Sequence, residues 1–280
     1  MRKEFSSILA AAVAASVTLA VLHGAQKKWR TSPVGYTDTP VLPGQKWKVH
    51  DIDRPQPPVV LPGARPGQPP SDAVVLFDGK DFSQWTTRDG KPPAWRLAEG
   101  AMVSAASHAQ GEKSGTGDLL SKVRFGSAQI HVEFATPNMP QAKGQARGNS
   151  GVYLQARYEI QVLDSYQNPT YANGSSGALY GRYAPLVNAS RPPEEWQTYD
   201  IIFEAPVFDG DKLVRPVYFT VFHNGVMLHN HKESLGPMVF RQVAHYTPHE
   251  PTASLMLQNH NNPVHYRNIW VRPVGEYDKP

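Results

Sequence analysis

The strongest constraint on the fold is a two-residue alternation of apolar and polar side chains, which recurs from Val74 towards the C-terminus. In the segment Ala128–Phe134, apolar residues alternate with Gln129, His131 and Glu133. Successive side chains of a strand point to opposite faces, so this spacing predicts a strand with one buried face. No segment has a sustained helical period. The sequence therefore predicts an all-β fold.

Turn-forming residues separate the predicted strands. Asp78-Gly79 and Glu99-Gly100 end two short apolar segments, and Asn224-Gly225 lies in the hairpin predicted over Val217–Leu228. An Asn-Gly pair between two alternating segments is a strong hairpin signal. Short strands without helices between them are typical of an antiparallel β-sandwich or jelly roll. The other expected strands are Val74–Phe77, Trp95–Leu97, Leu119–Ser121, Thr198–Phe203, Ala253–His260 and Val264–Arg272.

The composition agrees with a turn-rich β protein, because the chain has 22 glycines and 26 prolines while only 19% of its residues are charged. The absence of cysteine excludes disulfides, thiolate zinc sites, a cysteine nucleophile and a lipoprotein-type anchor. The formal net charge of +4 is small and its basic residues are scattered. We therefore expect no nucleic-acid partner.

The first 25 residues have the pattern of an export signal. Arg2 and Lys3 precede an apolar run at Ile8–Leu22, and polar residues follow it. The run is short for a membrane span of about 20 residues. We expect residues 1–25 to be a signal peptide or an uncleaved signal anchor, which would be the link of this chain to a membrane. In both cases bacterial export would place the rest of the protein in the periplasm or outside the cell.

Residues 26–72 are rich in proline and glycine. Proline fixes φ and lacks an amide donor, so this segment predicts an extended linker rather than a helix or a central strand. We expect Trp47 and the apolar run Val59–Leu61 to hold it along the folded domain. The domain itself is expected over residues 73–275.

The stretch Gly148–Asp164 is the candidate centre of the site. Its second half alternates, with Ile160 and Val162 on one face of a strand and Glu159 and Gln161 on the other. One apolar face and one hydrogen-bonding face suit the floor of a sugar-binding cleft. An ordinary solvated sheet face remains the alternative.

Several separated motifs occur in order between Ala73 and Val274. They are Leu76–Phe82 with Trp85, Gly148–Tyr153, Tyr158–Asp164, Gly177–Gly181, Glu195–Asp200, Asn224–Val226 and the segment from Gln258 to Ile269. Together they resemble the family of 3-keto-disaccharide hydrolases, formerly a domain of unknown function. The resemblance implies a concanavalin A-like β-sandwich that acts on glycosides oxidised at carbon 3.

Two segments depart from the pattern of that family. Its usual His-Gly-Asp-Pro is here His260-Asn261-Asn262-Pro263, so a role of the aspartate in relatives does not carry over. The segment Pro237–Pro251 is longer than the common form of the family.

The residues favour a reaction with a single base. Conventional glycosidases use two carboxyl groups, about 5–5.5 Å or 6.5–9.5 Å apart. Here Gln161 stands where a second acid would be expected beside Glu159, and alternation puts Asp164 on the opposite face. A 3-keto group acidifies the hydrogen at C2, so one base suffices for β-elimination, and water can then add. We expect Glu159 or His260 to be this base.

Further polar residues are candidates for substrate binding: Asn149, Gln161, Tyr180, Gln258 and Arg267. Each candidate also has a structural explanation. Glu159 could pair with a basic neighbour, Asn149 could serve only its turn, and Arg267 could bridge a buried carboxylate. Trp85, Trp95, Trp196 and Trp270 could stack on sugars, although a place in the core suits them better.

The sequence identifies no cofactor with certainty. His229 and His231 would share one face of a strand, but no acidic partner lies at an obvious spacing. A divalent cation held by Glu159, Asp164 or His260 stays open, and the metal ligands are unknown. The expected partner is a glycoside or keto-sugar substrate. A non-catalytic carbohydrate-binding sandwich and a docking protein are the alternative functions.

Overall fold

The computed structural model describes residues 34–105 and 117–278. The predicted signal at residues 1–25 lies outside them. The chain forms two compact units, one up to Gln56 and one from Pro57 onward. In the first unit, bridges join Tyr36 to Asp51 and Val41 to Lys48. Within the described part of the chain, no helix has the length and apolarity that a membrane crossing requires.

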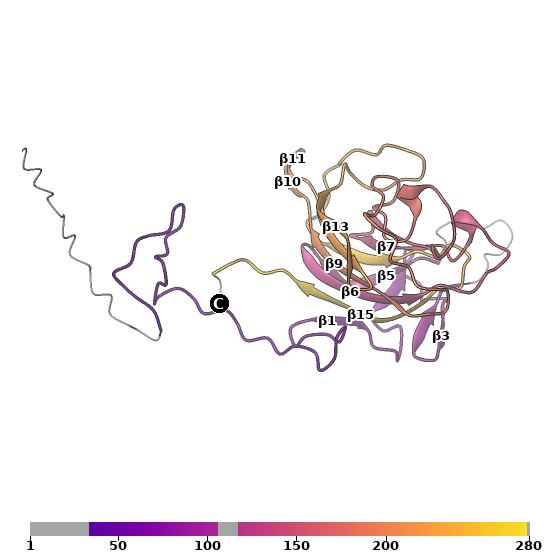
Figure 1. Ribbon diagram of the computed structural model, residues 1–280, viewed down its shortest axis with the longest axis horizontal. Helices are drawn as coiled ribbons and strands as arrows, with labels where there is room; N and C mark the ends of the chain where they lie inside the picture. Colours follow the sequence, from indigo (N-terminus) through magenta and orange to yellow (C-terminus); the bar gives the residue numbers. More distant parts are fainter. Residues whose placement is uncertain (1–33, 106–116, 279–280) are drawn as a thin grey trace, which may run out of the picture. The chain divides into compact units, whose positions relative to one another are not determined.

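The second unit is built from antiparallel sheets, which confirms the predicted β-sandwich (Figure 1). Over the described residues its larger sheet has eight strands, in the order β13-β12-β9-β6-β15-β4-β3, with β1 paired to β15. These strands are β1 (Val74–Phe77), β3 (Arg96–Ala98), β4 (Ala101–Val103), β6 (Ala128–Ala135), β9 (Gln197–Glu204), β12 (Tyr218–His223), β13 (Val226–Glu233) and β15 (His265–Pro273).

The smaller sheet of the sandwich has five strands in the order β2-β5-β14-β7-β8. They are β2 (Trp85–Thr87), β5 (Leu119–Phe125), β7 (Ser150–Leu154), β8 (Tyr158–Val162) and β14 (Ala253–Leu257). A separate hairpin pairs β10 (Val207–Asp209) with β11 (Lys212–Arg215). Two single 3-10 turns, Gly144–Ala146 and Ala172–Gly174, lie in the loops.

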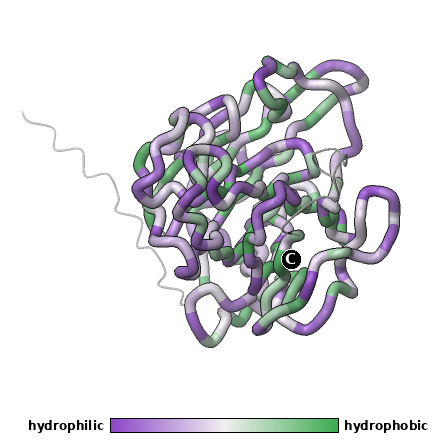
Figure 2. Tube along the Cα trace, turned by 90° about the vertical axis from the view of Figure 1, so that its right-hand side faces the viewer, coloured by the Kyte–Doolittle hydropathy of each residue, from purple (hydrophilic) through white to green (hydrophobic). Residues whose placement is uncertain are grey.

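The core lies between the two sheets. Ile130, Val132 and Phe134 of β6 are fully buried, as their alternation predicts, and Ile160 and Val162 of β8 are buried in the same core. Hydrophobic segments run mainly through the middle of the fold and hydrophilic ones through its outer loops (Figure 2). Burying such side chains contributes about 1.5–3 kcal/mol each, so this layer supplies the main stabilisation of the sandwich.

The hairpin β12–β13 turns at Asn224-Gly225, as predicted. Both residues have positive φ, 52° and 78°, which is the type I′ geometry that an Asn-Gly pair favours. Asn224 also accepts a hydrogen bond from the amide of Thr198 and donates one to the carbonyl of Ala189. The turn is therefore fixed by local geometry and by its neighbours together.

A strap formed by residues 57–72 lies against the outer face of the larger sheet. In the apolar run Val59–Leu61, which was expected to hold this segment, Val59 is 91% and Leu61 67% exposed, and Val60 is half-buried. The contact is made at Gly67, whose carbonyl accepts hydrogen bonds from Asn268 Nδ2 (2.8 Å) and Trp270 Nε1 (2.9 Å). A glycine is needed there, since a Cβ would lie 3.2 Å from the His131 ring.

Candidate active site

The floor of the candidate site is the outer face of the five-stranded sheet. In the pairing of β7 with β8, Tyr153 lies opposite Glu159 and Gly151 opposite Gln161. Met256 of β14 pairs with Tyr153 from the other side. Paired residues of neighbouring strands point to the same face. The hairpin therefore brings the tyrosine, the carboxyl group and the amide together on the face away from the core.

The outer edge of β8 is covered by the segment 177–180. Its backbone bonds to β8 run from Gln161 N to the carbonyl of Ala178 (3.0 Å) and from Tyr180 N to the carbonyl of Glu159 (3.2 Å). The ring of Tyr180 is thereby held beside Glu159. Its hydroxyl group lies 3.0 Å from that of Tyr171.

These elements enclose what we call the central cavity, about 660 Å³ in volume. This size is typical of small-molecule sites. Its lining residues come from β7 and β8, from the segment before β7, and from the segments that follow β8, β13 and β14. They are Gln145, Asn149, Tyr153, Glu159, Gln161, Tyr171, Tyr180, Met238, Phe240, Gln258 and His260. The cavity thus brings together all the predicted site residues except Arg267.

Glu159 lies at the bottom of the central cavity and is only 2% exposed. A Cβ on Gly151 would lie 2.6 Å from Glu159 Oε1, so the glycine makes room for the carboxyl group. Burial raises the pKa of Glu159 to about 8, a hydrogen bond from the Tyr153 hydroxyl opposes this, and the negative charge of Asp118 adds to it. Near neutral pH the group can therefore both release and accept a proton.

Tyr153 links Glu159 to the neighbouring strand. Its hydroxyl accepts a hydrogen bond of 3.3 Å from Gln258 Nε2. Burial raises the pKa of Tyr153 well above its ordinary value, and the nearby carboxylate of Glu159 raises it further. Tyr153 therefore keeps its proton and acts as a donor.

Gln161 and Asn149 form a second polar group on the floor. Gln161 Nε2 donates to Asn149 Oδ1 (3.1 Å), and Asn149 Nδ2 donates to the carbonyl of Gln145 (2.8 Å). Gln161 Oε1 is buried and has no hydrogen-bond partner among the described residues. A buried acceptor without a donor costs about 1–3 kcal/mol. A hydroxyl group of a ligand in the cavity would remove this cost.

His260 lies at the edge of the cavity on a turn built by two asparagines. Asn261 has a φ of +61°, a left-handed conformation that asparagine tolerates and glycine adopts most easily. Asn262 Nδ2 donates to the carbonyl of His260 (2.8 Å), and its Oδ1 accepts from the amide of Gly148 (2.8 Å). A carboxylate could accept from Gly148 but could not donate to His260. Here Asn262 therefore joins the turn at His260 to the start of the hairpin β7–β8.

Arg267 lies elsewhere, on β15 of the larger sheet. Its Nε donates to Glu133 Oε2 (2.6 Å), and its guanidinium group stacks on Trp196 at 3.9 Å. The structure thus gives Arg267 the carboxylate-bridging contact that was its alternative explanation. Asp164 also points away from the cavity and pairs with Arg147 at 2.8 Å. Trp85 and Trp95 are buried in the core and Trp270 is buried beneath the strap, and none of the four candidate tryptophans lines the central cavity.

The prediction that His229 and His231 share one face of a strand is wrong. His231 has a φ of +42° where the pairing with β12 shifts register, which turns its side chain outward. His229 is buried with its Nε2 at 2.9 Å from the carbonyl of Gly177, whereas His231 is exposed and stacks on Tyr218. Among the described residues, no group of three His, Cys, Asp or Glu side chains could hold a metal ion.

Sequence reasoning missed five of the residues that line the cavity: Gln145, Tyr153, Tyr171, Met238 and Phe240. Tyr153 could have been found from the hairpin register, because the turn Gln155-Ala156 puts it opposite Glu159. That turn contains no glycine or asparagine, so no local signal marks it. Tyr171, Met238 and Phe240 come from loops distant in sequence, and no periodic pattern places them here.

The comparisons with known proteins agree with this architecture. No curated protein matches the chain. A protein of Parabacteroides distasonis described as a glycosyl hydrolase is 38% identical, with a TM-score of 0.71, and the match covers 82% of this chain and 99% of that one. A second glycosyl hydrolase, so described, from the same organism shares the fold at 20% identity and a TM-score of 0.53, over 72% of this chain and 94% of that one.

The family comparison covers the whole sandwich. The model of the 3-keto-alpha-glucoside-1,2-lyase-like domain matches residues 72–272, which include every residue that lines the central cavity. The predicted resemblance is thereby confirmed. The chain belongs to the family of the 3-keto-alpha-glucoside-1,2-lyase-like domain.

Proposed function

We propose that this protein cleaves the glycosidic bond of 3-keto-glycosides by β-elimination followed by hydration. The observation that supports this is the lining of the central cavity, in which Glu159 is the single carboxyl group among the described residues. A conventional glycosidase needs a second carboxyl group across the scissile bond. One tunable carboxyl group among neutral hydrogen-bonding side chains suits proton abstraction next to a ketone.

The coarser assignment follows from the comparisons. Membership of this family and the 38% identity to a protein described as a glycosyl hydrolase make the domain a carbohydrate-active one of the hydrolase or lyase type. The 3-keto substrate and the order of steps are our proposal. Export to the periplasm or the medium stays a prediction from residues 1–25.

In the proposed reaction, the carboxylate of Glu159 accepts the proton from C2. The electron pair of that bond is delocalised onto the C3 ketone oxygen as an enolate and then forms the C1–C2 double bond. The C1–O bond breaks at the same time as His260 gives a proton to the leaving oxygen. Water next adds at C1 and gives a proton to His260 while Glu159 returns its proton to C2, so both groups are regenerated, the net reaction is hydrolysis and no redox partner is consumed.

The neutral side chains would bind the sugar and stabilise the enolate. Asn149, Gln161 and Gln258 offer amide groups on the floor, and the buried oxygen of Gln161 accepts a sugar hydroxyl. Preorganised donors of this kind favour a transition state in which negative charge develops. A carboxyl pKa of about 8 matches a base that works near neutral pH.

The test is release of free sugar from a 3-keto-disaccharide by the purified protein. Glu159→Gln should lower kcat at least about 100-fold, since a general base contributes about 10²–10⁴. His260→Ala should lower kcat by as much on a substrate with a poor leaving group. It should regain activity on a 4-nitrophenyl 3-keto-glucoside, whose leaving group needs no acid. In the wild type, kcat/KM should rise with pH up to about 8, as Glu159 loses its proton.

The exposed residues Glu195 and His231 provide matched controls. Glu195→Gln and His231→Ala should keep wild-type turnover. Full activity in both Glu159→Gln and His260→Ala would refute the assignment of the catalytic pair. If the wild type binds sugars but never releases product, the protein is a carbohydrate-binding sandwich instead.

A further inference from the structure

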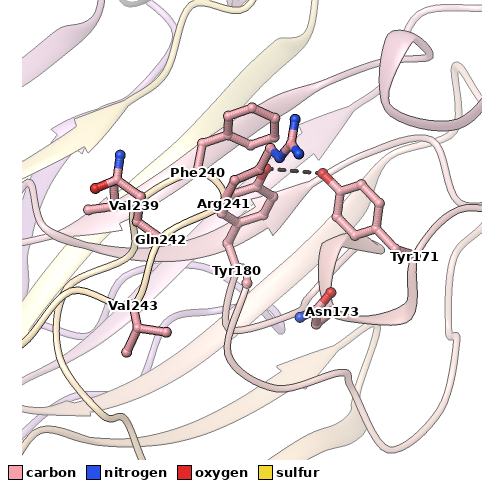
Figure 3. A pocket seen from close by; sticks show the side chains of 9 residues that line it. Tyr171, Asn173, Tyr180, Val239, Phe240, Arg241, Gln242 and Val243 are labelled. Atoms are coloured by element: carbon pink, nitrogen blue, oxygen red, sulfur yellow. Dashed lines mark hydrogen bonds between the residues drawn. The ribbon is translucent and has the colours of Figure 1, made fainter.

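A second cavity adjoins the central one and shares part of its wall. This outer cavity has a volume of about 470 Å³. Tyr171, Tyr180 and Phe240 line both cavities. Figure 3 shows the hydrogen-bonded hydroxyl groups of the two tyrosines, with the side chains of Phe240 and Arg241 close to them in this view. A ligand on the floor beside Glu159 could thus extend past the tyrosine pair into the outer cavity.

The far wall of the outer cavity is the loop 238–243, which the fold holds at both ends. Arg182 Nη2 donates to the carbonyl of Pro237 (2.8 Å) and to that of Ala244 (2.9 Å), so one guanidinium group closes the loop. Met238 is buried, and its amide donates to the carbonyl of Arg157 (3.1 Å). The loop lies within the segment Pro237–Pro251, and these hydrogen bonds fix its position against the sandwich.

The tip of this loop offers an unusual surface. Phe240 is 63% and Val243 71% exposed, although both are apolar. Between them, the guanidinium group of Arg241 has no hydrogen-bond or ion-pair partner among the described residues, and its backbone has a φ of +55°. Exposed aromatic surface beside a free cation suits a ring that carries an anionic substituent, because the ring packs on Phe240 while Arg241 binds the anion.

We propose that the outer cavity binds the leaving group of the glycoside and prefers a ring-bearing leaving group with a carboxylate, which Arg241 recognises. This inference rests on the proposed function, since it assigns the sugar to the central cavity. The two adjoining cavities match the two parts of a glycoside, the sugar in the central cavity and the leaving group in the outer one. The ring of the leaving group would pack between Phe240 and the pair Tyr171 and Tyr180. Arg182 is a positioning residue that keeps the loop in place.

The experiment compares three 3-keto-α-glucosides, whose leaving groups are methanol, 4-carboxyphenol and the neutral 4-carbamoylphenol. The wild-type protein should prefer the carboxyphenyl over the carbamoylphenyl substrate at least about tenfold in kcat/KM, which is the effect of one charge-assisted hydrogen bond. Arg241→Gln should reduce this ratio to near one, and Arg241→Lys should keep part of it. Phe240→Ala should lower kcat/KM for both aryl substrates relative to the methyl one.

Arg96→Gln is the control, because Arg96 is an exposed arginine on β3 that lines neither cavity. It should keep the wild-type ratio. If all three substrates are cleaved and Arg241→Gln leaves the ratio unchanged, the assignment of the outer cavity is wrong while the proposed function stands. If the wild type cleaves none of them, methyl glycoside included, the proposed function fails and the leaving-group assignment fails with it.

Discussion

Glu159 and Gln161 are buried polar side chains whose interactions within the protein are incomplete. Glu159 is almost fully buried with one hydrogen-bond donor, Tyr153, and the buried oxygen of Gln161 has none among the described residues. Such groups destabilise a fold, and they persist where a site needs them. The energetic cost at these two residues is the physical mark of a site prepared for a polar ligand.

The pKa of Glu159 predicts a pH-dependent stability. It is 4.5 in an unfolded chain and about 8 in the fold, so between these values the folded protein holds a proton that the unfolded chain releases. The free energy of unfolding should therefore fall as pH rises from 4.5 to 8. Glu159→Gln removes this loss and should stabilise the protein at pH 8 by roughly 3–5 kcal/mol relative to wild type, at 1.36 kcal/mol per pKa unit.

Urea unfolding of the wild type and of Glu159→Gln at pH 4 and pH 8 measures this difference. At pH 4 the two proteins should be close in stability, since the carboxyl group is protonated in both states. An equal difference between them at the two pH values would show that Glu159 is not buried as described. Glu195→Gln, at an exposed position, should change neither value.

At the scale of elements, the hairpin β7–β8 creates the site. Its turn places Gln155 and Ala156 at φ of +51° and +53°, although neither is glycine or asparagine. Gln155 Nε2 donates to the carbonyl of Pro251 (2.8 Å), a contact 96 residues away in sequence. The strained turn is therefore stabilised by the tertiary structure, and it sets the register that pairs Tyr153 with Glu159.

Replacing Ala156 by glycine should stabilise the protein by about 0.5–2 kcal/mol, because a left-handed conformation costs an L-residue roughly 1–2 kcal/mol and costs glycine almost nothing. Thermal unfolding provides the measurement. Ala142→Gly is the matched control, since Ala142 does not have positive φ and should lose stability slightly. A destabilised Ala156→Gly would mean that the turn is not under strain.

At the scale of the whole molecule, the strap 57–72 lies over a network of ion pairs in the larger sheet, which centres on the buried His131. His131 stacks on Trp270 and lies 2.7 Å from Asp200 and 3.6 Å from Glu133, which Arg267 also contacts. Burial opposes the charge on His131, but the hydrogen bond to Asp200 and the nearby carboxylate of Glu133 raise its pKa to about 9. The interactions of protonated His131 with the acids therefore contribute fully to the free energy of unfolding below pH 6.5, and this contribution is lost as pH rises through 9.

Gly67→Ala tests the strap contact. The residue has a φ of +82°, and its Cβ would approach the His131 ring to 3.2 Å, so we expect a loss of about 1–3 kcal/mol. Gly210 has a φ of +54°, and a Cβ added there would have no atom within 4 Å. Gly210→Ala should therefore lose only the conformational part of that free energy. Chemical unfolding of both variants gives the comparison. Equal losses would show that the strap does not depend on this close approach.

The sequence by itself determined the features that depend on neighbouring residues. Alternation over two residues assigns Ile130 and Ile160 to the core, and Asn224-Gly225 fixes its turn through its own backbone preference. The same alternation placed Glu159 and Gln161 on one polar face. These properties are local, so a pattern in the chain is enough to predict them.

Only the tertiary structure decided which distant residues meet. Phe240 and Tyr171 complete the cavity over Glu159, Arg267 pairs with Glu133 instead of facing the cavity, and the turn at Gln155 takes a conformation that its own residues disfavour. Each of these depends on strand register and on contacts between segments far apart in the chain. Such long-range contacts leave no periodic trace in the sequence, because their energy arises only once the two sheets have packed.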